Sequence, residues 1–107
     1  SGRGGDGLLS LWTPNVIRET CPAIAGRMGR AALRLNSIQN EAEGMGYSQA
    51  EIDAFRKSEA NKAAMRAEGE AYMKKNGVAK GDAETYCALG RAEIAKSSQI
   101  GRLLRAN

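Results

Sequence analysis

A seven-residue apolar repeat between residues 24 and 45 constrains this chain more than any other feature. Apolar side chains recur there in alternating steps of four and three, at Ile24, Met28, Ala31, Leu35, Ile38, Ala42 and Met45. This spacing places them along one face of an α-helix. Because proline favours the first position of a helix, we predict a helix from Pro22 to the glycines at positions 44 and 46, with its apolar stripe facing a helical core.

Composition favours helices over the rest of the chain as well. Phe, Tyr and Trp make up only 5% of the 107 residues, so alanine, leucine, isoleucine and methionine must fill the interior. Residue types that favour strands are correspondingly scarce. The length fits one domain.

Local signals predict the other helices. Thr13-Pro14 is typical of a helix start, and this first helix should end near Cys21, before Pro22. The sequence Ser48-Gln49-Ala50-Glu51 is a capping box that opens a short helix to about Lys57, and we expect Ile52 and Phe55 to be its inward anchors.

A longer helix should run from Ser58 or Glu59 to Asn76, closed by Gly77 in the left-handed conformation. We expect its inner face to be the alanine stripe at Ala60, Ala64, Ala67 and Ala71. A last helix should span about Ala83 to Leu104. The predicted fold is therefore all-α, a single domain of four to five helices in a bundle-like or orthogonal array.

The start of the chain is rich in glycine, with four glycines in the first seven residues. We predict a flexible segment over residues 1–12, of the kind that follows signal-peptide removal, and a helical domain over residues 13–107. Apolar side chains near the start of the chain should dock on the core, with partner binding or weak membrane-surface contact as alternatives. They are an apolar cluster at Leu8, Leu9, Leu11 and Trp12, followed by Val16 and Ile17. No apolar stretch is long enough to span a membrane.

Two cysteines, Cys21 and Cys87, lie 66 positions apart. An isolated pair fits no zinc pattern and lacks the two-residue spacing of a redox dithiol. We favour one structural disulfide formed in an oxidising compartment, with two buried free thiols as the alternative.

The formal charge is +4, and histidine is absent, which removes the usual general base and a common metal ligand. We expect no catalytic, cofactor-binding or metal-ligating residues. Arg27, Arg30 and Arg34 share one helical face. That face is either solvated or a binding site for a phosphate, a lipid headgroup or an acidic partner. Nucleic-acid binding has no strong signal, since aromatic residues are not interleaved with the arginines.

The last helix carries a second candidate interaction site around Cys87, at Arg91 and Glu93 with Glu84 nearby. We expect a buried Arg–Glu pair that organises the bundle. A catalytic acid is the alternative, but nothing in the sequence gives the carboxylates the different environments that acid–base catalysis requires.

Four segments, in this order, resemble the domain of unknown function 5333 family. They are IRETCP at residues 17–22, GYSQAEI at 46–52, YCALGRAEI at 86–94 and SQIGRLLR at 98–105. The resemblance covers about residues 16–105. It implies a small alphaproteobacterial protein made with a signal peptide and exported to the periplasm, and it supports a disulfide, but it carries no activity.

These observations favour a non-enzymatic periplasmic protein that binds another protein as an accessory subunit of a larger assembly. One alternative is a small enzyme or ligand-binding protein with a Glu/Arg site on the last helix, at Arg91 and Glu93. Another is a cytosolic nucleic-acid binder that uses the basic face of the second helix.

Overall fold

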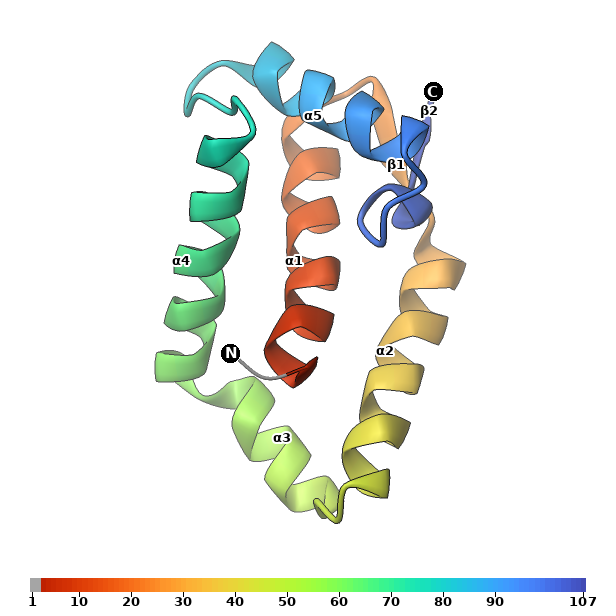
Figure 1. Cartoon of the computed structure of the whole chain (residues 1–107), viewed down its shortest axis with the longest axis vertical. Helices are drawn as coiled ribbons and strands as arrows, with labels where there is room; N and C mark the ends of the chain where they lie inside the picture. The colour runs from red at the N-terminus through yellow and green to blue at the C-terminus, as the bar shows by residue number, and fades with distance from the viewer. Residues whose placement is uncertain (1–2) are drawn as a thin grey trace.

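A computed structural model of the chain describes residues 3–107, with side chains from residue 10 onward. Five α-helices form within these residues, together with one short 3₁₀ helix and two three-residue strands (Figure 1). In chain order the elements are α1 (Arg3–Thr20), β1 (Ile24–Gly26), α2 (Met28–Gly44), α3 (Gln49–Lys57), α4 (Glu59–Lys75), α5 (Ala83–Ala95), η1 (Gly101–Leu103) and β2 (Leu104–Ala106). The all-α prediction is confirmed, with a small two-stranded ribbon added to it.

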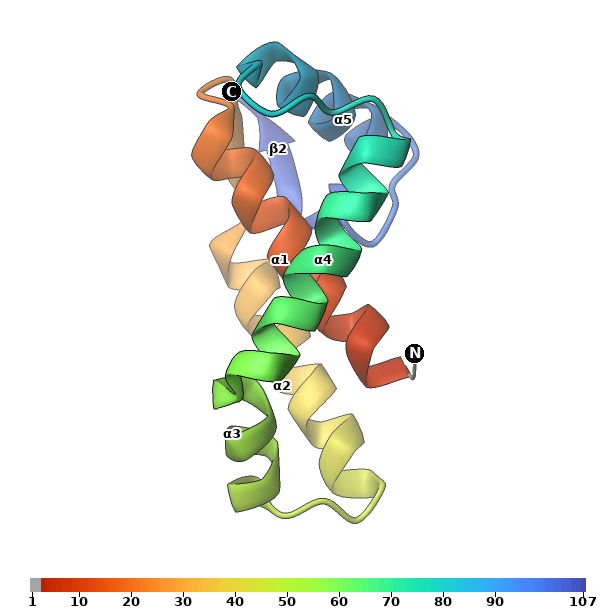
Figure 2. The same cartoon turned by 90° about the vertical axis from the view of Figure 1, so that its left-hand side faces the viewer.

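The helices surround α1. Figure 1 shows α1 between α4 and α2, with α3 joining the lower ends of these two helices and α5 lying across the top. Figure 2 shows α4 crossing α1, and α2 with α3 extending beyond the N-terminal end of α1. The molecule is elongated, with extents of 41 × 26 × 19 Å. The array is therefore orthogonal at the α5 end and open at the α3 end.

The apolar core lies at the α5 end. Its buried residues come from the second half of α1, the ribbon, the end of α4 and α5: Ile17, Cys21, Ile24, Met73, Tyr86, Cys87, Leu89, Ile100 and Leu104. Gly90 allows α5 to approach closely, because a Cβ at this position would overlap the side chain of Ile24. Burial of these side chains stabilises the fold by the hydrophobic effect.

The first helix begins at Arg3, whereas the sequence predicted a start at Thr13, so Pro14 lies inside a helix. Proline removes one backbone hydrogen bond there. Pro14 is buried, and Trp12 packs against α4, so tertiary packing offsets the loss. The flexibility expected of residues 1–12 stays a prediction, and residues 1–2 lie outside the described range.

The predicted start of the second helix at Pro22 is wrong. Ile24 belongs to β1, which pairs antiparallel with β2 in the register Ile24↔Ala106, Ala25↔Arg105 and Gly26↔Leu104. The helix starts only at Met28. Of the predicted stripe, only Ile24 enters the core, since no residue of α2 is buried. Met28 at the start of α2 is 60% exposed, and Met45, just after its end, is 58% exposed.

The predicted extension of the last helix to Leu104 is also wrong, because α5 ends at Ala95. Ser97 takes a positive φ of 50°, and the amide of Ser98 then donates to the Glu93 carbonyl at 3.2 Å. Gly101 lies against that same carbonyl, where a Cβ would overlap the backbone. The chain therefore turns back and forms η1 and β2.

The inner face of α4 differs from the prediction. The alanines at positions 60, 64, 67 and 71 are exposed, while Gly69 and Met73 are buried. Gly69 faces the Trp12 ring so closely that a Cβ would overlap it. A bulky aromatic side chain on α1 therefore selects the glycine face of α4 and turns the alanines outward.

The capping predictions for the start of α3 and the end of α4 are confirmed. Ser48 Oγ accepts from the Glu51 amide at 3.1 Å, and Glu51 Oε1 accepts from the Ser48 amide at 2.9 Å. Gly77 has a φ of 90°, as a left-handed helix cap requires. In α3, Ile52 is buried as expected, but Phe55 is 47% exposed and is not an inward anchor.

Candidate functional site

The two cysteines form the predicted disulfide, with their Cα atoms 5.3 Å apart. Cys21 follows the end of α1 and Cys87 lies in the first turns of α5, and both are buried. The free-thiol alternative is therefore wrong. A disulfide of this kind is consistent with an oxidising compartment.

The predicted basic face of α2 lies beside the C-terminal segment. Arg27 Nε donates to the Leu104 carbonyl at 3.2 Å, and Arg30 Nη1 donates to the Arg102 carbonyl at 3.0 Å. Arg34 Nε is 3.5 Å from Ser10 Oγ on α1, at the limit of a hydrogen bond. All three arginines thus join α2 to neighbouring elements through their side chains.

Two further arginines, Arg102 and Arg105, lie in the C-terminal segment whose carbonyls accept from Arg27 and Arg30, and both are exposed. We call Arg27, Arg30, Arg34, Arg102 and Arg105 the arginine cluster. Within the part of the chain that the structure describes, no carboxylate lies within 4.0 Å of any of them. Sequence reasoning missed Arg102 and Arg105, because no local pattern shows that the C-terminal segment returns to α2.

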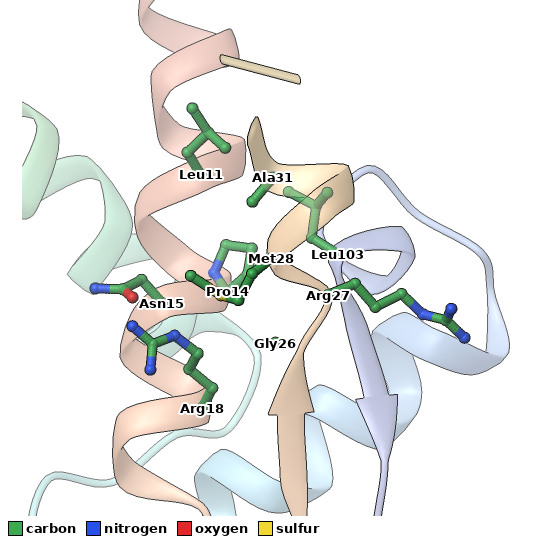
Figure 3. Close-up of a pocket in the computed structure, with 9 residues that line it drawn as sticks. All are labelled: Leu11, Pro14, Asn15, Arg18, Gly26, Arg27, Met28, Ala31 and Leu103. Carbon is green, nitrogen blue, oxygen red and sulfur yellow. The ribbon is translucent and has the colours of Figure 1, made fainter. Parts of the chain in front are cut away.

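A shallow cleft of about 50 Å³ opens between α1 and the start of α2, next to the cluster (Figure 3). Figure 3 shows Pro14, Met28 and Leu103 gathered at its centre, and Arg27 directed away toward the C-terminal segment. Its lining is mostly apolar and consists of Leu11, Pro14, Asn15, Arg18, Gly26, Arg27, Met28, Ala31 and Leu103.

Large exposed apolar side chains gather on one part of the molecule. We call residues 28–57, which comprise α2, the turn after it and α3, the arm. Among the residues whose side chains the structure describes, the large exposed apolar ones are all in the arm, namely Met28, Leu33, Met45, Tyr47 and Phe55. Leu33 is the most exposed of them, at 71%.

Trp12, a predicted interaction residue, packs against Gly69 and joins the edge of the core. Leu11 from the same apolar cluster lines the cleft. Leu8 and Leu9 lie where the structure describes no side chains. The described part of the cluster thus docks onto the protein itself.

Glu93 is the most buried charged side chain of the described core, at 1% exposure. Its carboxylate accepts from Tyr72 Oη at 3.0 Å and from Ser98 Oγ at 2.9 Å, and Lys96 Nζ lies 2.7 Å from the second oxygen. Burial raises the pKa of this carboxyl, but the bonds from Lys96, Ser98 and Tyr72 outweigh it, and the net pKa is lowered. Glu93 thus ties α4 and the turn after α5 to α5.

Arg91 does not pair with Glu93. It pairs instead with Glu84 on the surface, where the two side chains are 53% and 72% exposed. Residues two positions apart lie on nearly opposite sides of a helix, which separates Arg91 from the buried Glu93. The buried Arg–Glu pair expected from the sequence is therefore wrong, and the Glu/Arg constellation of the enzyme alternative is not assembled by these two residues.

Neither a metal-binding cluster nor a membrane-spanning helix is found among the described residues. No group of three or more cysteine and acidic side chains is placed to hold a metal ion. No helix in this range is both long and apolar enough to cross a bilayer.

The sequence model of the family of unknown function DUF5333 matches residues 5–105, nearly the whole chain. The chain belongs to this family. The match extends the resemblance seen in the sequence back to residue 5, so it includes most of α1. No curated protein and no solved structure matches this DUF5333 chain.

Proposed function

We propose that this DUF5333 protein is a non-enzymatic periplasmic accessory protein, and that its arm binds another protein. The observation that carries the proposal is the exposure of the arm. A 17-residue helix, α2, has no buried residue, and the large exposed apolar side chains of the described chain all lie between residues 28 and 55. Exposed apolar side chains that gather in one region mark interaction sites more often than scattered ones do.

The disulfide and the family support the periplasmic location. Cys21 and Cys87 are bonded, and such bonds persist in oxidising compartments. The family resemblance implies export of the chain to the same kind of compartment.

A non-enzymatic role is supported by the chemistry of the last helix. Arg91 points to the surface, while Glu93 is held by Tyr72, Ser98 and Lys96 in a structural network. The chain also has no histidine to act as a base near neutral pH.

Photo-crosslinking tests the proposal. A benzoylphenylalanine replaces Leu33 on the arm in the exported full chain, and a matched variant carries it at Ala67, an exposed position on the outer face of α4. We expect one discrete crosslinked protein from position 33 and none from position 67. The partner, identified by mass spectrometry and purified, should then bind the protein and lose at least tenfold in affinity for Leu33→Ser, the loss expected of a central contact.

The proposal fails if position 33 gives no discrete product, or the same products as position 67. It also fails if the purified partner binds the Leu33→Ser protein as well as the unmodified chain.

A further inference from the structure

Resting on the proposed function, we infer the chemistry of the partner: an acidic protein segment whose carboxylates contact the arginine cluster and whose apolar side chain enters the cleft between α1 and α2. The juxtaposition of cluster and cleft carries this inference. Arg27 belongs to both, and Leu103 of the cleft lies between Arg102 of the cluster and Leu104, whose carbonyl holds Arg27.

The arginine cluster carries positive charge that no neighbouring carboxylate neutralises. Among the described residues, no carboxylate lies within 4.0 Å of any of its five arginines. The whole chain is also basic, with 16 basic and 12 acidic residues and a formal charge of +4. Unneutralised positive charge on a basic chain favours an anionic partner by long-range attraction.

The arginines of α2 are held in place for this contact. Arg27 and Arg30 each donate to a backbone carbonyl of the C-terminal segment. A guanidinium has five N–H donors in a planar fork, so one bond to a carbonyl leaves others for a ligand. Because these side chains are already ordered, a carboxylate that binds them loses less conformational entropy, and the planar fork matches a carboxylate.

The cleft adds an apolar anchor point beside the charges. Leu11, Pro14 and Leu103 line it, and Met28, 60% exposed, stands among them. It is too small for a cofactor, whose pockets are several times larger, but it suits part of one aliphatic side chain. An apolar residue flanked by acidic residues on the partner would fill it.

A nucleic acid fits this surface less well. Binders of single strands place aromatic rings among their basic residues. The described aromatic side chains lie elsewhere: Trp12 packs on α4, Tyr72 and Tyr86 belong to the core region, and Tyr47 and Phe55 lie toward the α3 end of the arm. Carbonyl-held arginines beside an apolar cleft also suit a protein segment better than a lipid surface, which mobile basic side chains serve equally well.

A selection from a random dodecapeptide library displayed on phage tests the inference against the oxidised full chain. The cluster variant is Arg102→Glu/Arg105→Glu, since these exposed side chains make no described hydrogen bond or ion pair that folding would need. The control is Arg66→Glu/Lys74→Glu, which changes the net charge equally at exposed positions on α4, outside the arm. Thermal unfolding verifies that both variants are folded.

We expect the selected peptides to be acidic and to share an aliphatic residue. A synthetic peptide from the selection should lose at least tenfold in affinity for the cluster variant and less than twofold for the control, and its binding should weaken with added salt. Met28→Ser should weaken it as well, since Met28 lines the cleft.

Selection of neutral or basic peptides, or of none, would overturn the inference. The inference would also be overturned if a thymidine oligonucleotide, or vesicles containing phosphatidylglycerol, bound more tightly than the peptide and lost that binding in the cluster variant. If the selected peptides were neutral and bound the Leu33→Ser variant more weakly than the unmodified chain, the acidic partner would be overturned. The proposed function would then still stand. Absence of a discrete crosslinked product from position 33 would overturn the proposed function itself.

Discussion

The core and the arm of this protein are built in opposite ways. The core brings residues from five elements into one buried cluster and closes it with the Cys21–Cys87 disulfide. The arm has 30 positions, from 28 to 57, and buries only Ile52. Most helical stability in proteins comes from packing an apolar face, so the two regions cannot be equally stable. The fold is therefore specified at one end, which leaves the surface of the other end available for a partner.

The arm has no core of its own and is stabilised by local hydrogen bonds instead. The capping box of Ser48 and Glu51 starts α3, and Arg27 and Arg30 fix the beginning of α2 to the C-terminal segment. Such bonds contribute about 1 kcal/mol each in net terms, far less than a packed core. Substitutions in the two regions should therefore differ in their effect on stability, and the largest effect is expected in the core.

Removal of the disulfide should weaken the core most. In the chain-entropy description, a bridge that closes a loop of 66 positions stabilises the fold by about 4 kcal/mol. We expect Cys21→Ala/Cys87→Ala to lower the free energy of unfolding by about that amount, measured by urea denaturation. An unchanged transition midpoint would show that the bridge does not stabilise the core.

Glycine-to-alanine changes should have opposite signs in the two regions. A Cβ at Gly101 would overlap the Glu93 backbone carbonyl, which cannot move aside cheaply, so Gly101→Ala should cost about 3 kcal/mol. Gly29 in α2 has open space around it, and Gly29→Ala should stabilise by roughly 0.5 kcal/mol through helix propensity. Destabilisation of both variants, in the same urea titrations, would contradict the open environment of α2.

Glu93 should make the core sensitive to acid. Folding lowers the pKa of Glu93 below its ordinary value of 4.5, so its contribution to stability is fully present above this pH and is lost as the pH falls through the lowered pKa of the folded state. We expect Glu93→Gln to cost about 2 kcal/mol near neutral pH, because it breaks the contact with Lys96. Stability measured as a function of pH should then fall less steeply in acid for the variant.

The matched arm variant is Glu51→Gln. Bonds from Ser48 lower the pKa of Glu51 too, but Glu51 is exposed, so the acid limb of its stability curve should change less than for Glu93→Gln. A larger change for Glu51→Gln than for Glu93→Gln would contradict the attribution of the acid sensitivity mainly to Glu93.

The smallest effect on stability belongs to the arm surface. Leu33 is 71% exposed, so Leu33→Ser should change the free energy of unfolding by less than about 0.5 kcal/mol. Thermal unfolding measures this directly. A loss of about 2 kcal/mol would mean that Leu33 packs against the protein and is not free for a partner.

The sequence carries the local structure of this fold well. Ser48 and Glu51 stand at capping-box spacing, and Gly77 marks a helix end, because both signals depend on residues that are close in the chain. The number and spacing of the cysteines favoured the disulfide over free thiols, and the structure confirms it. The separation of Arg91 from Glu93 was also predictable, since two positions along a helix turn a side chain to the other side.

Long-range contacts decide what the sequence does not show. The predicted last helix continues to Leu104, whereas pairing with β1 makes Leu104 the first residue of a strand. Trp12 decides which face of α4 points inward, and the return of the C-terminal segment places Arg102 beside Arg30. Three of the five cluster arginines were therefore predictable from helical spacing, and the place of the other two, Arg102 and Arg105, depends on tertiary structure.

Native-state hydrogen exchange of the oxidised protein tests the division between core and arm most directly. Amides in α5 and in the second half of α1 should exchange only through global unfolding, because their side chains form the buried cluster. Amides of α3 and of the second half of α2 should exchange through local opening, with a smaller free energy. Equal protection of the arm and α5 would contradict the account, because the arm would then be part of one uniformly stable core.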